Sequence, residues 1–297
     1  MKKTLLVLAL ALIGVSACPY QAYAMNKDKD TEYTNDAEEN TKQELGISFE
    51  VGADLVSSYL WRGQNLGGIS IQPSVTLGWK GLYVCGWANI GADNWTFTEL
   101  CPELDITIGY DNFGFQVDLT HYYYFDETPY FPKGGFNVVP EQESSSTMEL
   151  HLGFHLGDII EKVPLSIDWY TTVFGADYYV LDGKAQRAWS TYIEAGYDFN
   201  LPLGMVLGAR VGIVPWRSVY TNYEEVWTNA KTVAINNVNL RLEREFDLKA
   251  ICVSVWGECM LNCYGLDKTN LTTTLENKFE QRLNWGVGGS IYLSNEW

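Results

Sequence analysis

The chain has 297 residues and a formal net charge of −17, with 20 Lys and Arg against 37 Asp and Glu. Proteins that bind nucleic acid need basic side chains to meet the phosphates, so this charge argues against such a partner. Aromatic residues (11 Trp, 19 Tyr and 12 Phe) and Gly (27) are abundant, and no helical pattern of apolar residues is found, which favours a chain of alternating strands.

The N-terminal segment carries the features of an export signal. Met and two lysines are followed by an apolar run from Leu5 to Val15, which is too short to cross a bilayer as a helix. An A-x-A site ends at Ala24, and we predict cleavage there, with 1–24 as the signal peptide. The alternative is a lipoprotein box ending at Cys18, which would be acylated. Either processing places the mature chain beyond the inner membrane.

A short acidic segment follows the signal. Residues 25–45 contain few apolar side chains, and their acids outnumber their bases: Asp28, Asp30, Glu32, Asp36, Glu38, Glu39 and Glu44 against Lys27, Lys29 and Lys42. Such a composition cannot bury a core, so we predict a disordered periplasmic lead-in. A functional acidic arm is the alternative.

The rest of the chain, 46–297, alternates apolar residues with small or polar ones. Residues 148–156 place Met, Leu and Phe on one face and Glu, His and Gly on the other. A barrel wall between lipid and lumen imposes this period of two. The segments are 46–61, 69–79, 81–92, 102–110, 112–125, 146–157, 163–178, 187–199, 203–215, 231–246, 248–262 and 282–297. They predict an all-β fold, a transmembrane antiparallel up-and-down β-barrel of about 12 strands.

The links between these segments alternate in length. Short links join Trp79 to Leu82, Tyr110 to Phe113, Gly157 to Val163, Phe199 to Leu203 and Phe246 to Leu248, whereas others, such as 126–145, 216–230 and 262–281, are long. Outer-membrane barrels have short periplasmic turns and longer extracellular loops. The alternation therefore predicts a cell outer-membrane location, with contact to outer-membrane lipid and both chain ends in the periplasm.

Aromatic residues gather where strands are expected to leave the hydrocarbon. They are the run 122–125, Tyr59 with Trp61, the pair Tyr178 and Tyr179, and Trp216, and they predict an interfacial girdle. The last strand ends on Trp297, which resembles the signal that the barrel-assembly machinery reads. A soluble all-β sandwich or surface lectin is the alternative, since it would also alternate.

One stretch resembles a known family. Residues 57–63 read Ser-Ser-Tyr-Leu-Trp-Arg-Gly, which is similar to the S-x-Y-x-x-R-G opening of the TorF-type porins. Residues 81–89, 103–110 and 122–124 resemble that family's next strands, so the likeness covers about residues 46–125 and is thin afterwards. Where the family usually follows its tyrosines with Pro, this chain has Phe125 and Asp126. The resemblance implies an outer-membrane barrel with no settled substrate.

The polar face of the predicted strands is rich in acids. The inward candidates are Glu50, Asp54, Asp105, Asp118, Glu149, Asp168, Glu194, Asp198, Glu243, Glu245 and Glu258, against Arg62, Arg210, Arg241 and Arg282, with Trp87, Tyr83, Tyr170 and Tyr192 as inward aromatics. An acidic lining predicts a narrow porin-like channel for small cationic or polyhydroxy solutes. The alternative is an internal ion-pair network in a plugged structural or ligand-binding barrel without conductance.

A subset of these residues forms our predicted lumen or solute site: Arg62, Glu50, Asp54, Asp105, Glu149, Glu194, Asp198, Arg210, Arg241 and Trp87. Arg62 closes the family-like motif at the extracellular end of the first predicted strand. It is expected either to clamp an anionic group of a solute or to tie the strand to an inner acid.

Catalysis, a metal and a cofactor are not predicted. An outer-membrane lipid hydrolase would need a base, and the chain offers only His121, His151 and His155, with no serine motif beside them. Four residues apart on a strand, His151 and His155 are separated by about 13 Å, which is too far to share one ion. We interpret them as hydrogen-bonding groups that line the lumen.

Overall fold

The computed structural model describes residues 46–91, 103–124, 146–175, 177–181, 184–216, 218, 220, 233–248, 251–263 and 283–296. The predicted signal peptide, the lead-in and Trp297 lie outside these residues. The wall is built of β1 (Ile47–Val56), β4 (Ser70–Trp79), β5 (Leu82–Gly91), β6 (Glu103–Asn112), β7 (Phe115–Tyr124), β8 (Ser146–His155), β9 (Leu165–Gly175), β12 (Thr191–Leu201), β13 (Met205–Val214), β14 (Ala234–Asp247), β15 (Cys252–Leu261) and β16 (Leu283–Glu296). Each of the twelve predicted segments overlaps one of these strands, and β6, β12 and β14 run one or two residues past the predicted ends.

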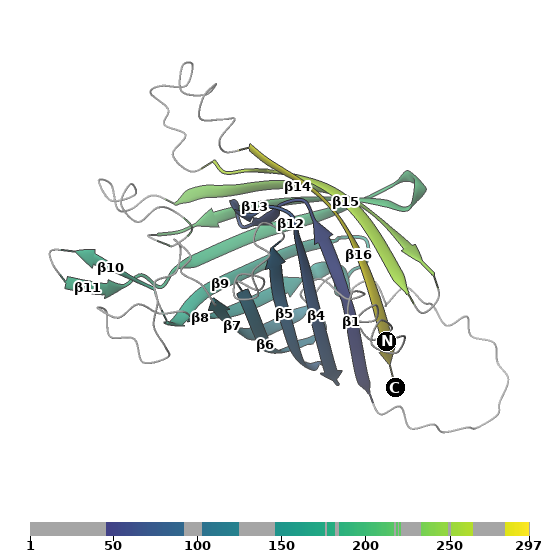
Figure 1. The fold of residues 1–297 in the computed structure, drawn as a ribbon, viewed down its shortest axis with the longest axis horizontal. Helices are drawn as coiled ribbons and strands as arrows, with labels where there is room; N and C mark the ends of the chain where they lie inside the picture. The colour runs from purple at the N-terminus through teal and green to yellow at the C-terminus, as the bar shows by residue number, and fades with distance from the viewer. Residues whose placement is uncertain are drawn as a thin grey trace, which may run out of the picture.

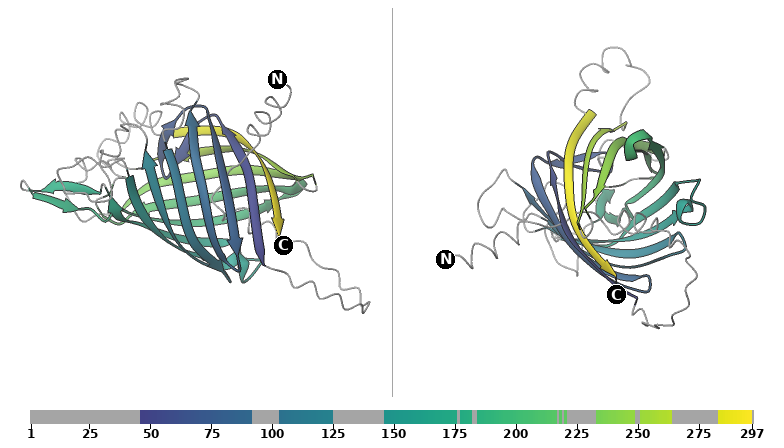
Figure 2. Two further views of the ribbon diagram at one scale, coloured as in Figure 1. Left: turned by 60° about the horizontal axis from the view of Figure 1, so that its bottom comes forward. Right: turned by 90° about the vertical axis from the view of Figure 1, so that its right-hand side faces the viewer.

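The wall strands close into an antiparallel barrel. Its order is β1-β16-β15-β14-β13-β12-β9-β8-β7-β6-β5-β4, and closure is made by pairing of β1 with β16, from Ser48 opposite Glu296 to Val56 opposite Gly288. Figure 2 shows the strands inclined side by side in one view and arranged in a ring in the other. The predicted up-and-down barrel of twelve strands is confirmed.

Two small hairpins stand apart from the wall. β10 (Tyr178–Leu181) and β11 (Lys184–Arg187) form a hairpin in the link between β9 and β12, and it projects beyond the barrel at the left of Figure 1. β2 (Tyr59–Trp61) and β3 (Gln64–Gly67) form another hairpin in the link between β1 and β4. The sequence pattern predicted neither as a separate element.

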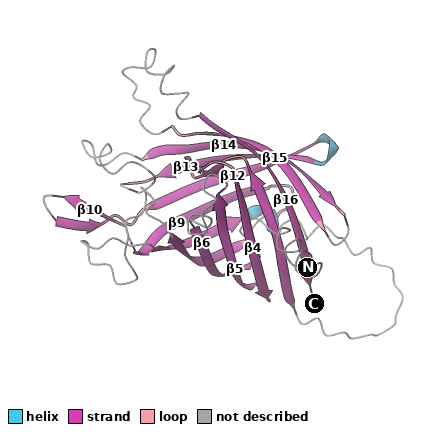
Figure 3. Cartoon of the chain, in the orientation of Figure 1, coloured by secondary structure: helices cyan, strands magenta, loops and turns pink. Residues whose placement is uncertain are grey.

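Short and long links sort to opposite ends of the barrel, as predicted. At the short-link end, Lys80 and Gly81 both have positive φ, as do Phe113 and Gly114. Two such residues form the tight turn whose twist matches antiparallel strands. Two 3-10 turns, Leu156–Asp158 and Pro202–Gly204, serve other short links and are drawn in cyan among the strands of Figure 3. In the described part of the chain, no helix is long and apolar enough to cross a membrane.

The two faces of the wall differ in polarity. On β6 the burial alternates residue by residue: Ile106 and Ile108 face outward and are exposed, whereas Glu103, Asp105 and Thr107 are buried inside. The outward face is apolar, as contact with hydrocarbon requires, and the inward face is polar. Position along each strand therefore decides which side chains reach the lumen.

Most outward aromatic side chains lie near the ends of the wall strands, and Trp169 lies within β9. Those near the short-link end are Phe49, Trp79, Tyr110, Phe113, Phe115, Phe199 and Phe246, and those near the long-link end are Tyr123, Phe174, Trp189, Trp216 and Trp285. The predicted girdle was wrong for four residues. Tyr122 and Tyr124 lie on the inward face of β7, and Tyr59 and Trp61 belong to the β2–β3 hairpin, whose rings approach Trp87 and Tyr122.

Inward glycines leave room for large rings. A Cβ on Gly212 would lie 2.2 Å from the hydroxyl of Tyr192, and a Cβ on Gly288 would lie 2.5 Å from the ring of Trp256. Because these positions carry no side chain, the aromatic residues fold flat across the neighbouring strand instead of pointing at the barrel axis. Tyr192 is almost completely buried as a result.

Candidate functional site

The β2–β3 hairpin begins where β1 leaves the wall. The backbone N–H of Ser57 donates to the carbonyl of Val287 on β16 (2.9 Å), and the hydroxyl of Ser57 accepts from the N–H of Val287 (2.9 Å). A side chain thus replaces the next rung of the ladder. The predicted strand 46–61 therefore ends at Val56, and the chain turns at Arg62 and Gly63, which both have positive φ.

The tip of the hairpin reaches across the barrel. It is rooted between β1 and β4, yet Arg62 meets Glu149 on β8, which is separated from β4 by β5, β6 and β7. In the other direction, the Asn236 amide on β14 donates to the carbonyl of Arg62 (3.0 Å), and the Asn262 amide donates to that of Gly63 (3.0 Å). The hairpin is held from opposite sides.

Gly63 is required at this tip for two reasons. Its φ is +83°, and an added Cβ would lie 2.2 Å from the backbone carbonyl oxygen of Asn236. A side chain there would be strained and would push the hairpin off β14.

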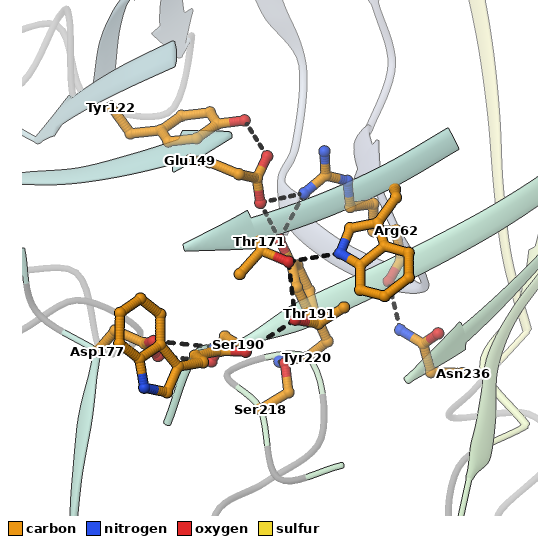
Figure 4. A network of polar contacts seen from close by, with 12 residues as sticks. Arg62, Tyr122, Glu149, Thr171, Asp177, Ser190, Thr191, Ser218, Tyr220 and Asn236 are labelled. Atoms are coloured by element: carbon orange, nitrogen blue, oxygen red, sulfur yellow. Dashed lines mark hydrogen bonds and ion pairs between the residues drawn. The ribbon is translucent and has the colours of Figure 1, made fainter. Parts of the chain in front are cut away.

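The guanidinium of Arg62 is enclosed by one carboxylate and several aromatic rings. Its Nη1 donates to Glu149 at 2.7 Å and also to the hydroxyl of Tyr220 (Figure 4). The side chains of Arg62 and Glu149 are only 9% and 3% exposed. We name the enclosing residues the Arg62 cage: Trp61, Tyr122, Glu149, Tyr170, Tyr192 and Tyr220. The Arg62 Cζ atom lies 3.7 Å from the Tyr170 ring centre and 4.6 to 5.5 Å from those of Trp61, Tyr192 and Tyr220.

The charge of the cage is balanced locally. Burial acts to lower the pKa of Arg62, but Glu149, with Tyr220 and Tyr122, raises that pKa well above its usual value. Glu149 in turn accepts from Tyr122 (2.9 Å) and from Tyr220 (2.6 Å), so both of its oxygens are hydrogen-bonded. Arg62 is therefore a permanent cation inside the barrel entrance.

A second polar cluster lies nearer the short-link end, on β7, β8 and β9. His151 bridges Asp118 (2.8 Å) and Asp168 (3.0 Å), and His155 reaches the same Asp168 oxygen (2.9 Å). The two rings thus converge on one carboxylate although their positions are four residues apart. Gly153 gives them space, since its Cβ would lie 2.9 Å from the His155 ring. We call this the histidine network.

The histidine network touches the Arg62 cage through one ring pair. His151 stacks on Tyr170, with centroids 4.2 Å apart and planes 7° apart. Among the described residues, no group of three or more His, Cys, Asp or Glu could hold a metal ion.

Basic residues are unevenly placed around the wall. β1 and β4 to β9 carry no Lys or Arg, and we call these seven strands the acidic sector. Its buried or half-buried inward acids are Glu50, Asp54, Glu103, Asp105, Asp111, Asp118, Glu149 and Asp168. On β1, β4, β5 and β6 there is no His either. Among the described residues, the Oδ1 atom of Asp105 and the Oε1 atom of Glu50 have no hydrogen-bond partner.

The remaining strands, β12 to β16, form what we call the mixed sector. Its arginines are Arg210 on β13 and Arg241 with Arg244 on β14. Arg210 pairs with Asp198 across neighbouring strands (2.7 Å), and Arg241 pairs with Glu243 (2.9 Å). Both of these ion pairs are made within the wall.

The predicted site residues are therefore dispersed. Among the described residues, two pairs of predicted site residues form ion pairs, Arg62 with Glu149 and Arg210 with Asp198. Glu194 accepts from Tyr192 and from Asn237 beside the cage (3.2 Å to Asn237). Glu50, Asp54 and Asp105 lie in the acidic sector, Arg241 stacks over Trp256 at 4.0 Å, and Trp87 packs against Tyr59 at 5.6 Å.

Sequence reasoning missed three residues that hold the hairpin. Tyr220 lies in the link between β13 and β14, Asn236 lies near the start of β14, and Asn262 follows β15. No local signal marks them, because their role depends on where a distant loop folds. Tyr122 and Trp61 carried a visible signal, but it was interpreted as a membrane-interface girdle.

Comparison with known proteins gives similar folds only. No family model matches the chain, and no curated protein matches it. An outer membrane channel from Pseudomonas putida F1 is similar over 87% of this chain and 100% of its own, with 12% identity and a TM-score of 0.38. The outer membrane channel DcaP of Acinetobacter baumannii covers 83% of this chain and 71% of its own, with 10% identity and a TM-score of 0.31.

A third solved structure, OmpF of Salmonella typhi in complex with daunomycin, covers 84% of this chain and 97% of its own, with 8% identity and a TM-score of 0.34. Scores this low say nothing about substrate or activity. The resemblance to TorF-type porins stays a prediction, because none of these matches tests it.

Proposed function

We propose that this chain is a channel of a Gram-negative outer membrane that admits small solutes and prefers cations. The observation that carries the proposal is the acidic sector: its seven adjacent wall strands carry no Lys or Arg, and five of them, β1 and β6 to β9, present buried or half-buried carboxylates. A carboxylate-lined path between low-dielectric walls attracts cations and repels anions. Polyhydroxy solutes are also suited to it, because carboxylates and aromatic faces such as that of Trp87 bind hydroxyls and sugar rings.

The long-link end is placed at the cell surface in this proposal, following the loop rule for outer-membrane barrels. The β2–β3 hairpin then lies in the extracellular entrance and narrows it. The lumen of a twelve-stranded barrel is wider than that of an eight-stranded barrel, which side chains fill, and narrower than that of a sixteen-stranded porin. A narrow path of low conductance, bounded by the hairpin and the acidic sector, is expected.

Selectivity tests the proposal. The double variant Asp105→Asn and Glu50→Gln removes two acidic-sector carboxyl groups without changing side-chain shape. The reversal potential across a planar bilayer with a salt gradient should shift towards zero, with a cation-to-anion permeability ratio lower by about 2–5-fold, since the two carboxylates together contribute on the order of 0.5–1 kcal/mol to the attraction of a passing cation. The matched control is Glu243→Gln, whose charge is paired with Arg241 and whose effect should be smaller. Anion preference in the unaltered protein would contradict the proposal.

A plugged, ligand-binding barrel is the second candidate, favoured by the many contacts that hold the hairpin tip. Glu149 alone is unsuited to a selectivity test, because its neutralisation also releases Arg62. Current that is absent from the unaltered protein and present in Arg62→Ala would support the plugged barrel. No enzymatic activity is proposed, since His151 and His155 are both engaged with Asp168 and no serine motif accompanies His121.

A further inference from the structure

The Arg62 cage is built mainly by the barrel and not by the hairpin that occupies it. Tyr122, Tyr170 and Tyr192 stand on β7, β9 and β12, and Glu149 stands on β8. Tyr220 comes from the link between β13 and β14. Only Trp61 arrives with Arg62. The wall therefore provides a receptor, and the hairpin provides its occupant.

The wall side chains of the cage are held by partners other than Arg62. Tyr122 donates to Glu149 (2.9 Å), and Tyr192 bonds to Glu194 and accepts from the Asn237 amide (2.9 Å). Tyr170 is fixed by its stack on His151. Because these contacts do not involve the guanidinium, the receptor keeps its shape when the guanidinium leaves.

The chemistry of the receptor selects a planar cation. The Arg62 guanidinium lies over the face of Tyr170, with its carbon 3.7 Å from the ring centre, while one nitrogen donates to Glu149 at 2.7 Å. Aromatic faces and a buried carboxylate together bind a cation by ring electrostatics and by a charge-assisted hydrogen bond. A neutral molecule of the same shape would leave Glu149 buried without a counter-charge.

We propose that the cage is a binding site for solutes that carry a guanidinium group, and that Arg62 is its tethered occupant, which such a solute displaces. The proposal deepens the proposed channel function and rests on it for the role of the site, because it names the solute that would open the entrance. A short tether holds an occupant at an effective concentration of about millimolar, so a free solute must compete at that level.

Removing the occupant should expose the receptor. In Arg62→Ala, guanidinium chloride at low millimolar concentration should raise the melting temperature in a saturable way, by about 3 °C at ten times its dissociation constant. Urea is the matched probe, because it is planar and neutral, and it should have no such effect. The double variant Arg62→Ala and Glu149→Gln should not respond to guanidinium. An equal response to urea, an equal response of the double variant, or no response of Arg62→Ala would overturn the proposal.

The unaltered protein gives a test that needs no variant. Guanidinium, and not urea, should speed hydrogen–deuterium exchange in residues 57–69 as the hairpin leaves the cage, and strands such as β6 should not change. Unchanged exchange in 57–69 at concentrations that saturate Arg62→Ala would overturn displacement. Neither measurement requires ion current. A barrel that does not conduct would contradict the proposed channel function, and the guanidinium site would still be tested by these two measurements.

Discussion

The two sectors of the barrel interior neutralise their carboxylates in different ways. In the mixed sector, Arg210 pairs with Asp198 and Arg241 with Glu243, each within one strand or between neighbours. In the acidic sector, Glu149 meets a cation that the β2–β3 hairpin brings from outside the wall, and Asp118 and Asp168 meet histidines. The two arginine ion pairs of the mixed sector are made within the wall, whereas Glu149 in the acidic sector depends on a cation from a hairpin.

The difference indicates that the β2–β3 hairpin, more than the mixed sector, sets the charge and the width of the lumen. A change in the mixed sector alters one local pair. A change at the hairpin alters the cation nearest to a set of buried acids and the obstruction at the entrance at the same time.

Arg62→Ala should destabilise the barrel far more than Arg210→Ala. The first variant leaves Glu149 buried without its cation, which costs about 3–5 kcal/mol when a buried pair is broken on one side. The second removes a pair whose side chains are 21% and 40% exposed, and exposed pairs contribute about 1 kcal/mol or less. Urea unfolding of the refolded protein in lipid vesicles measures both. Equal losses would abolish the contrast between the sectors.

Gly153→Ala should have the next largest effect, through the histidine network. Its new Cβ would lie 2.9 Å from the His155 ring and 3.1 Å from Asp168, and such overpacking costs about 1–3 kcal/mol.

Gly257→Ala is the matched control for that substitution. Gly257 lies on β15 in the mixed sector, where the nearest atom to an added Cβ is 3.8 Å away, so stability should be unchanged or slightly raised. If the two alanines behave alike in the same unfolding assay, Gly153 has no role in seating the histidines.

Arg241→Gln should give the smallest effect. It removes an ion pair with Glu243, whose side chains are 25% and 13% exposed, and a stack on Trp256, and we expect a loss of about 1 kcal/mol. Cation selectivity in the planar bilayer should rise slightly, because Glu243 loses its counter-charge. A shift as large as that of the Asp105 and Glu50 variant would place the selective path in the mixed sector instead.

The wall was predictable from sequence because its physics is local. The inward and outward environments alternate from one residue to the next, so each strand is visible as an alternating pattern in the sequence. The lengths of the links then show which strand ends lie at the same end of the barrel. β1 was overextended to residue 61 because Tyr59 and Trp61 continue the alternation after Ser57 has ended the ladder. That boundary is set by a hydrogen bond from the N–H of Val287 to the Ser57 hydroxyl, which the alternation of residues does not reveal.

The candidate site was only partly predictable, because it depends on contacts between distant segments. Arg62 and Glu149 were each selected, and a tie from Arg62 to an inner acid was one of two expectations, but nothing local pairs residues 87 positions apart. Whether a cage tyrosine faces the lumen or the membrane interface depends on its position in the inward–outward alternation of its strand. Tyr220 and Asn236 became visible only once the hairpin was seen to cross the barrel.

The course of the hairpin also bears on how the cylinder stays shut. A barrel has one joint, where its first and last strands meet, and here that joint is β1 against β16. The chain that leaves β1 bonds to β16 at Val287 and at Asn284, then to Asn262 beyond β15, and then to Asn236 on β14. The segment that follows the first strand is thereby hydrogen-bonded to the last three strands, or next to them, on the inside of the barrel. Separating β1 from β16 would therefore also require these hydrogen bonds of the hairpin to break.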